Sequence, residues 1–134
     1  MASGPRGIGF DTIQEAAKTI RLCPLIAFDE IMGGRYKLRI LFVLGQGDHR
    51  YGEIGRWLLK GTLGRKITPR ILSRELKDLE QNGLIVRTAY PVVPPKVVYS
   101  LTPRGREIKP IIDAIVRWGL TGAHEEILKI PKAA

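Results

Sequence analysis

Six Lys and Arg side chains stand close together between residues 60 and 77, where their charges could bind a polyanion. They are Lys60, Arg65, Lys66, Arg70, Arg74 and Lys77, and the acidic residue among them is Glu75. A guanidinium can donate two hydrogen bonds to O6 and N7 of guanine, and such a pair discriminates between bases by about 1 to 3 kcal/mol. Because a helix seated in the major groove can present an Arg in this way, the segment predicts a DNA-reading helix.

The basic segment divides into residues that could read bases and residues that could hold the backbone. The candidates for base edges share one face near the N-terminal end of the expected helix: Arg70, Ser73 and Arg74. The candidates for phosphate contact carry a charge or a hydroxyl around it: Lys66, Thr68, Lys77 and Lys96. Phosphate contacts set the register but carry no sequence information. The alternative for each residue is a solvated outer face, which any soluble helix needs.

Length and charge limit the classes of protein that fit. The 134 residues suit one domain, with residues 1–10 as a flexible lead-in and 11–134 as the folded part. The 44% of hydrophobic residues can form a core without disulfides or a metal. The 22 basic against 13 acidic residues give a net charge of +9, which favours an anionic partner such as nucleic acid, ribosome or anionic membrane.

Cys23 is the single cysteine, so the chain is not a module stapled by internal disulfides. The start of the chain lacks the apolar run of a signal peptide, and no uninterrupted apolar stretch is long enough to cross a membrane. We therefore expect a cytoplasmic protein with no membrane partner.

Catalytic and cofactor motifs do not emerge from the sequence. His49 and His124 are too few and too far apart to suggest a metal site, and no second cysteine completes a ligand set. The glycine pairs lack the third glycine of a dinucleotide fingerprint, and neither a phosphate loop nor a nucleophile elbow occurs. We expect no cofactor, no metal and no enzymatic activity.

The first sixty residues show three regions of helical periodicity. A short amphipathic helix is predicted from Asp11, as its N-cap, to the Cys23-Pro24 step. The apolar pattern from Leu25 to Leu44 is broken at Gly33-Gly34, which predicts two helical pieces. A third, short helix is predicted over residues 51–59.

Residues 60–83 contain a loop and a helix with well-marked ends. Residues 60–66 are Gly-rich and basic and predict an exposed loop. Thr68-Pro69 supplies an N-cap followed by proline at the first helical position, and Asn82-Gly83 closes the helix after Gln81. Its expected buried stripe is Ile71, Leu72, Leu76 and Leu79.

The remaining third of the chain changes from helical to extended periodicity and back. Residues 84–90 and 96–101 predict a β-hairpin with a proline-rich tip. Thr102-Pro103 repeats the N-cap signal, and a last helix through residues 108–118 is expected to kink at Pro110. Gly119, Gly122 and Pro131 punctuate the tail. Helices, one hairpin and a helix make a small α+β fold, in the order of a winged helix-turn-helix.

Several longer motifs carry a resemblance to a known family. They are Cys23-Pro24, Gly33-Gly34-Arg35-Tyr36, Tyr51-Gly52-Glu53-Ile54, the run from Ile67 to Glu80, Asn82-Gly83-Leu84-Ile85, and YPVVPPKVVYSLTPRG over residues 90–105. The sequence resembles the HxlR-type winged-helix transcriptional regulators, which are related to the MarR group, from about Cys23 to Gly119. The proline-rich hairpin is the most specific part of this match.

The resemblance implies a homodimer, joined through its N- and C-terminal helices, that binds a near-palindromic operator on double-stranded DNA as a repressor. The recognition helix would be residues 68–81, with residues 90–96 as the wing on flanking DNA. Many relatives use a cysteine just before this proline as a thiol sensor, which makes Cys23 a candidate redox sensor and an oxidant or a small molecule a candidate effector. The alternative for Cys23 is a buried, inert side chain.

Two departures from the family pattern leave questions for the structure. Residues 58–67 form a longer segment than relatives usually have, and this segment either adds phosphate contacts or extends the preceding helix. Val92 replaces a residue that is usually acidic, so the wing tip is more apolar.

Other functions remain to be compared with DNA regulation. A basic RNA- or ribosome-binding or architectural module would use the same charge, but the hairpin offers only Tyr90 and Tyr99 for stacking on bases. A thiol-dependent enzyme at Cys23 has no visible base beside the nucleophile. Trp57 and Trp118 are expected in a core or dimer interface rather than as stacking platforms.

Overall fold

The computed structural model describes residues 7–131, in two units that divide between Gly33 and Gly34. Each unit is described by itself. Of the expected lead-in, residues 1–6 lie outside the described part, residues 7–9 have no regular structure, and Phe10 already begins a helix. No helix in the described range 7–131 is both long enough and apolar enough to span a bilayer.

The first unit contains helices α1 (Phe10–Ala16) and α2 (Pro24–Met32). The prediction of Asp11 as N-cap was wrong, because Phe10 is already helical and the extended Gly9 precedes it. The prediction that this helix continues to the Cys23-Pro24 step was also wrong, because α1 ends at Ala16. The amides of Thr19 and Ile20 both bond to the carbonyl of Ala16, which closes the last turn. Pro24 then opens α2 at a position that needs no N–H donor.

The second unit is built around helix α3 (Lys37–Gly45), which packs against α4 (Tyr51–Leu58), α5 (Pro69–Gln81) and a β-sheet. The predicted break of the apolar pattern at Gly33-Gly34 is confirmed, because α2 ends and α3 begins on either side of it. The largest fully buried side chains form one core: Ile40, Leu41, Ile54, Leu58, Leu76, Leu79 and Ile85. Burying one such side chain contributes roughly 1.5 to 3 kcal/mol, so this core fixes the three helices.

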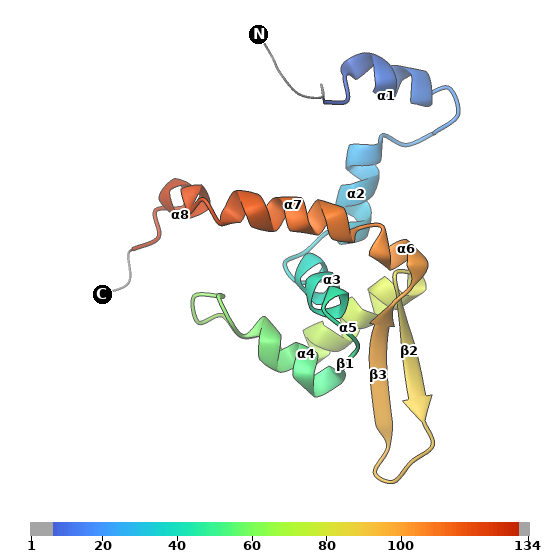
Figure 1. The fold of residues 1–134 in the computed structure, drawn as a ribbon, viewed down its shortest axis with the longest axis vertical. Helices are drawn as coiled ribbons and strands as arrows, with labels where there is room; N and C mark the ends of the chain where they lie inside the picture. Colours follow the sequence, from blue (N-terminus) through green and yellow to red (C-terminus); the bar gives the residue numbers. More distant parts are fainter. Residues whose placement is uncertain (1–6, 132–134) are drawn as a thin grey trace. The chain divides into compact units, whose positions relative to one another are not determined.

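The predicted hairpin is confirmed as β2 (Ile85–Tyr90) and β3 (Lys96–Leu101), which extends from the helices of this unit (Figure 1). Its antiparallel register pairs Ile85 with Leu101 and Tyr90 with Lys96. A third strand, β1 (His49–Arg50), pairs with β3, giving the order β1-β3-β2. The sequence did not predict β1, because two residues show no periodicity.

The C-terminal part contains helices α6 (Pro103–Arg106), α7 (Lys109–Gly119) and α8 (Ala123–Ile127). The expected kink at Pro110 was wrong: the chain forms two separate helices, and Pro110 lies in the first turn of α7, where its missing N–H costs no hydrogen bond. Helix α8 was not predicted, because the glycines and the proline near the end of the chain were interpreted only as helix breakers. Gly122, in the left-handed conformation, directly precedes α8. Mixed helices with a small antiparallel sheet confirm the α+β winged-helix expectation.

Candidate nucleic-acid interface

Helix α5 presents its two faces to different environments. The Thr68 hydroxyl accepts a hydrogen bond from the Ile71 amide at 3.2 Å, which confirms the predicted N-cap. Leu72, Leu76 and Leu79 are buried as predicted, and Ile71 is half-buried. The predicted base-reading residues Arg70, Ser73 and Arg74 are exposed to solvent, and so is the predicted phosphate contact Lys77. One face of α5 therefore holds the fold while the other is free for a partner.

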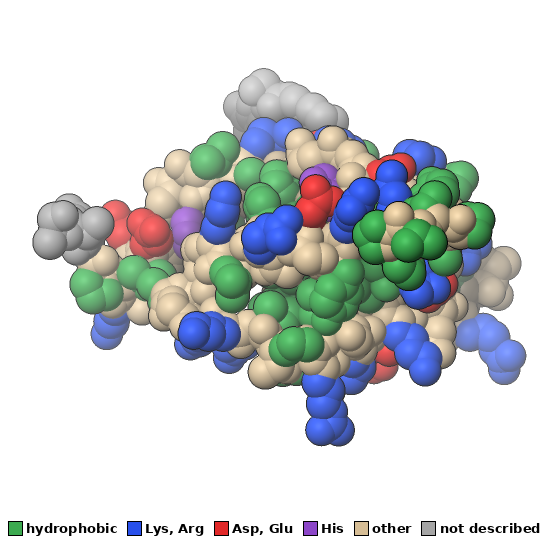
Figure 2. Space-filling view, turned by 90° about the horizontal axis from the view of Figure 1, so that it is seen from below, with side chains coloured by type: hydrophobic (Ala, Val, Ile, Leu, Met, Phe, Trp, Pro, Cys, Tyr) green, Lys and Arg blue, Asp and Glu red, His purple; other side chains and the backbone are tan. Residues whose placement is uncertain are grey.

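The Arg74 side chain is 64% exposed, and its terminal nitrogen lies 4.0 Å from Oε1 of Glu75. A pair at this distance with one exposed partner contributes little, so the guanidinium can turn toward a ligand. Viewed from the hairpin end, blue Lys and Arg side chains are spread over the surface, and a green apolar group lies on the side of the hairpin (Figure 2). The outer face of α5 therefore carries an exposed guanidinium that no short ion pair holds among residues 7–131.

Ser73 is linked to Tyr51, a residue that the sequence did not assign to the site. The Tyr51 hydroxyl donates to the Pro69 carbonyl at 3.0 Å and lies 3.2 Å from Oγ of Ser73. Tyr51 begins α4, so this contact joins the two helices of the helix-turn-helix at the solvent edge. The signal in the sequence was the position of Tyr51 at the start of the helix that precedes α5.

Helix α4 is held at its N-terminus by a carboxylate. Glu53 accepts a hydrogen bond from the backbone amide of Arg50 at 2.7 Å. This hydrogen bond lowers the pKa of Glu53, because it stabilises the ionised carboxylate. The cap fixes the turn between β1 and α4, from which Tyr51 reaches α5.

The inner face of α5 also carries a charge that the sequence analysis missed. Glu75 is buried, and its carboxylate pairs with the ammonium group of Lys37 on α3, itself buried. The same ammonium lies 3.4 Å from Oδ2 of Asp78, one turn further along α5. These ion pairs join α3 to α5. Periodicity alone assigns a Glu to the solvent side, so this position gave no signal.

Residues 60–66 form the predicted exposed loop, and Lys60, Arg65 and Lys66 are exposed. The alternative that the long segment extends the preceding helix was wrong, because α4 ends at Leu58. Arg39 holds the start of the loop: its Nη1 donates to the Leu58 carbonyl at 2.8 Å, and its Nη2 donates to the Lys60 carbonyl.

The wing carries one of the predicted phosphate ligands. Lys96 is half-buried, and its ammonium lies 5.2 Å from the ring centroid of Tyr90, its partner across the hairpin. At the tip, Val92 is half-exposed and Val93 is fully exposed. The structure therefore places a cation beside the turn of the hairpin, where β3 begins, and apolar side chains in the turn itself.

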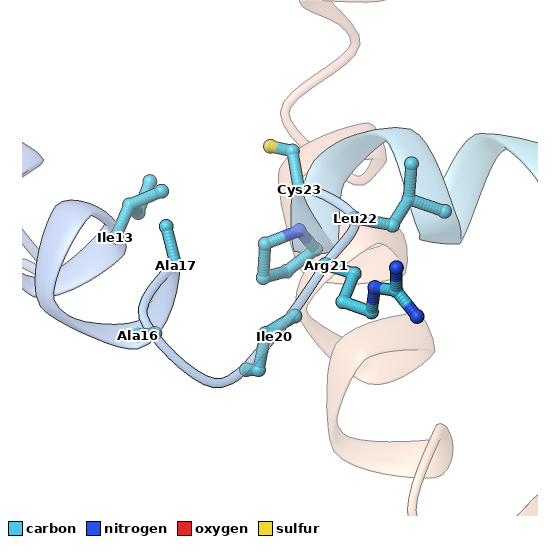
Figure 3. Close-up of a pocket in the computed structure, with 8 residues that line it drawn as sticks. Ile13, Ala16, Ala17, Ile20, Arg21, Leu22 and Cys23 are labelled. Carbon is cyan, nitrogen blue, oxygen red and sulfur yellow. The ribbon is translucent and has the colours of Figure 1, made fainter.

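Cys23 lies at the start of α2 as a free thiol of intermediate exposure. It lines a cavity of about 210 Å³ within the first unit, together with Ile13, Ala17 and Ile20 (Figure 3). In this view the sulfur faces the side of α1, whereas the guanidinium of Arg21 extends away from it. Arg21, the cation nearest in sequence, is therefore not a partner of the thiol.

The other candidates for chemistry are placed as follows. Trp57 packs against Phe42, with ring centroids 5.5 Å apart, and under the guanidinium of Arg39, which agrees with a packing role. Trp118 on α7 is 54% exposed. Within residues 7–131, no group of three His, Cys, Asp or Glu side chains is arranged to hold a metal ion.

Comparison with known proteins identifies the group to which this arrangement belongs. Residues 31–126 match the family described as HxlR-like helix-turn-helix. An HTH-type transcriptional regulator from Methanothermobacter thermautotrophicus is 44% identical over 107 residues, which cover 78% of this chain and 76% of that protein. The shared region includes the helix-turn-helix and the wing.

Solved structures give the same result. A MarR-family transcriptional regulator from Porphyromonas gingivalis W83 is 39% identical, with a TM-score of 0.66 over 76% of this chain and 94% of that one. The redox regulator HypR in its oxidized form is 34% identical, with a TM-score of 0.66 over 74% of this chain and 96% of that one. The chain therefore belongs to the HxlR-like helix-turn-helix family of transcriptional regulators, whose DNA-binding fold it shares.

Proposed function

We propose that the protein is a homodimeric repressor that occupies a near-palindromic operator, with α5 of each protomer in the major groove. The observation that carries this proposal is the outer face of α5, where Arg70 and Arg74 are exposed while the opposite face is locked into the core. A repressor of this kind acts by occlusion, because the occupied operator excludes the transcription machinery.

The hydrogen bonds of the Ser73 and Thr68 hydroxyl groups support the roles that we propose for them on DNA. Because the Tyr51 hydroxyl donates to Pro69, the Ser73 hydroxyl donates to Tyr51 and keeps its own lone pairs for a base amino group. Thr68 uses a lone pair for the α5 cap, so its hydrogen remains for a phosphate oxygen. Lys66, Lys77 and Lys96 complete the phosphate contacts.

Exposed apolar side chains on the terminal helices support a dimer. On α7, Ile111 and Ile115 are each 44% exposed and Trp118 is 54% exposed, at the spacing of one helical face. On α2, Leu25 and Ile26 are 69% and 51% exposed. A partner protomer would cover such a face, and a two-fold axis would set two α5 helices about 34 to 36 Å apart, one turn of DNA.

We expect the purified protein to enrich an inverted repeat from a pool of random double-stranded DNA at physiological salt. Its half-sites should lie about one helical turn apart, because the dimer fixes the spacing of the two α5 helices. An unenriched pool, with binding that only falls smoothly as salt increases, would contradict the proposal. That result would instead favour an RNA-binding or architectural module.

Replacing Arg74 with Ala should relax the preference at one position of each half-site, with a loss of about 1 to 3 kcal/mol of discrimination. Lys77→Ala is the matched control on the same helix. It should weaken binding to all sequences alike and reduce the slope of log K against log salt by about 0.9 per protomer contact. Repeating the selection with each variant measures both effects, and an unchanged preference profile for Arg74→Ala would remove Arg74 from base reading.

We further propose that Cys23 makes operator binding responsive to oxidants, as the partial exposure of its thiol permits. With one cysteine in each chain, oxidation can form a bond between subunits, a mixed disulfide or an overoxidised thiol. A mild thiol oxidant should change operator affinity for the wild type and leave Cys23→Ser unaffected. An equal response of both proteins would show that Cys23 is not the sensor.

A further inference from the structure

A larger cavity, of about 410 Å³, lies within the second unit. Its walls come from the start of α3, from residues 61–65 after α4, and from α8 with the residues that follow it. Its volume falls within the range of small-molecule sites, about 300 to 1,000 Å³. We call it the loop cavity, because one of its walls is formed by residues 61–65 of the exposed loop between α4 and α5.

Positive charge dominates the polar part of the loop cavity. Three guanidinium groups line it, those of Arg35, Arg39 and Arg65, against the one carboxylate of Glu125. Among residues 7–131, none of these guanidinium groups takes part in a salt bridge. The remaining wall is largely apolar: Tyr36, Leu63, Leu128 and Ile130. This combination suits an organic anion that has an apolar body.

Arg39 is held in place before any ligand arrives. It donates to the Leu58 and Lys60 carbonyls, and its guanidinium carbon lies 4.9 Å from the centroid of the Trp57 ring. Partial burial lowers the pKa of Arg39, because it removes water from the charge. An anion in the cavity would replace part of the water that stabilises the Arg39 charge. Because the Arg39 side chain is already ordered, binding would lose little conformational entropy there.

His124 provides an independent sign of a missing partner. It lines the loop cavity, and its ring packs against that of Trp118 at an angle of 45°, with centroids 5.8 Å apart. Its Nδ1 atom is buried and has no hydrogen-bond partner in the part of the chain that the structure describes. A buried polar atom without a partner costs about 1 to 3 kcal/mol, so such an atom calls for a ligand or a water molecule.

Leu63, at the outer wall, is exposed in an unfavourable backbone conformation. Its φ angle is +54°, in the left-handed region, and its side chain is 72% exposed. A left-handed backbone at a non-glycine residue is maintained by its surroundings and occurs often at ligand sites. An apolar ligand beneath the loop would cover this side chain.

We propose that the loop cavity binds a small carboxylate with an aromatic or branched apolar body, held by Arg39 and Arg65 and covered by Leu63. Arg65 stands three residues before Thr68, the N-cap of α5. Occupancy would therefore restrain the loop that leads into the recognition helix and change operator affinity. This regulatory consequence rests on the proposed function, whereas the binding itself does not.

The test uses calorimetric titration of the full-length protein without DNA, with benzoate as the probe. Benzamide is the neutral probe of the same shape, and inorganic phosphate is the bare anion. We expect benzoate to bind at millimolar concentration or below, and benzamide and phosphate to bind at least about tenfold more weakly, because each lacks one part of the complementarity.

Two variants locate the binding in the loop cavity. Arg65→Gln should weaken benzoate binding about tenfold, because it removes a charge-assisted hydrogen bond to the ligand. Within residues 7–131, the Arg65 side chain forms no hydrogen bond or ion pair that the substitution would also remove. Arg87→Gln, exposed on β2, is the control of equal charge and should bind as the wild type does. The proposal is overturned if benzoate and benzamide bind equally, or if Arg65→Gln leaves benzoate binding unchanged.

A second arm separates this inference from the proposed function. Benzoate should shift the affinity of the wild type for a selected DNA duplex and have no such effect on Arg65→Gln. One outcome would overturn the carboxylate site: phosphate binds as tightly as benzoate, and Arg65→Gln lowers the affinity for DNA without any ligand. The arginines of the loop cavity would then belong to the DNA interface. Benzoate binding by a protein that selects no DNA sequence would support the site and contradict the proposed function.

Discussion

Glu75→Ala should lower the free energy of unfolding by about 3 to 5 kcal/mol, because it removes the buried carboxylate that pairs with the buried ammonium group of Lys37. Lys37 is only 7% exposed, and after the substitution the carboxylate of Asp78 remains 3.4 Å away on a side chain that is 43% exposed. A loss of this size is a large fraction of the 5 to 15 kcal/mol that stabilises a typical domain. Chemical denaturation followed by circular dichroism measures it.

Two further variants make this result interpretable. Glu80→Ala, exposed on the same helix, removes a carboxylate without unpairing a buried charge and should change stability by no more than about 0.5 kcal/mol. The double variant Lys37→Met with Glu75→Leu should recover most of the loss, since apolar side chains of similar size replace buried ion pairs well. A loss for Glu75→Ala no larger than that for Glu80→Ala would show that the pair does not hold α5.

Gly105→Ala should cost about 3 kcal/mol or more, because a Cβ atom at this position would lie 2.1 Å from the carbonyl oxygen of Leu84. That oxygen cannot move freely, since it accepts a hydrogen bond from the Thr102 amide at 3.1 Å. The Thr102 hydroxyl accepts from the Gly105 amide and donates to the Gly83 carbonyl. The substitution would therefore separate α6 from the residues that connect α5 to the hairpin.

Gly119→Ala is the matched control for Gly105. A Cβ there would meet nothing closer than Cε1 of His124 at 3.9 Å, and the residue lies within α7. The added methyl group should leave stability unchanged or raise it by about 0.5 to 1 kcal/mol, because alanine favours a helix more than glycine does. Thermal and chemical denaturation measure the unfolding midpoint of each variant. Similar midpoints for Gly105→Ala and Gly119→Ala would contradict the close contact at Gly105.

The sequence determined the elements whose signals are local. Thr68-Pro69 and the Asn82-Gly83 step marked the ends of α5 because an N-cap, a first-turn proline and a left-handed glycine act within a few residues. The hairpin was evident because its strands adjoin the proline-rich turn that joins them. The exposed basic face of α5 followed from its 3.6-residue period.

The tertiary structure decided which polar groups are buried together. Glu75 can be buried on the inner face of α5 because Lys37, 38 residues earlier in the chain, lies opposite it. Ser73 similarly contacts Tyr51, 22 residues earlier. The pairing of β1 with β3 joins residues about 50 positions apart. The loop cavity likewise brings together the start of α3, the segment before α5 and α8. Local periodicity reports the environment of a residue only along its own element, whereas the partner that makes a buried charge or a short strand stable comes from a distant part of the chain.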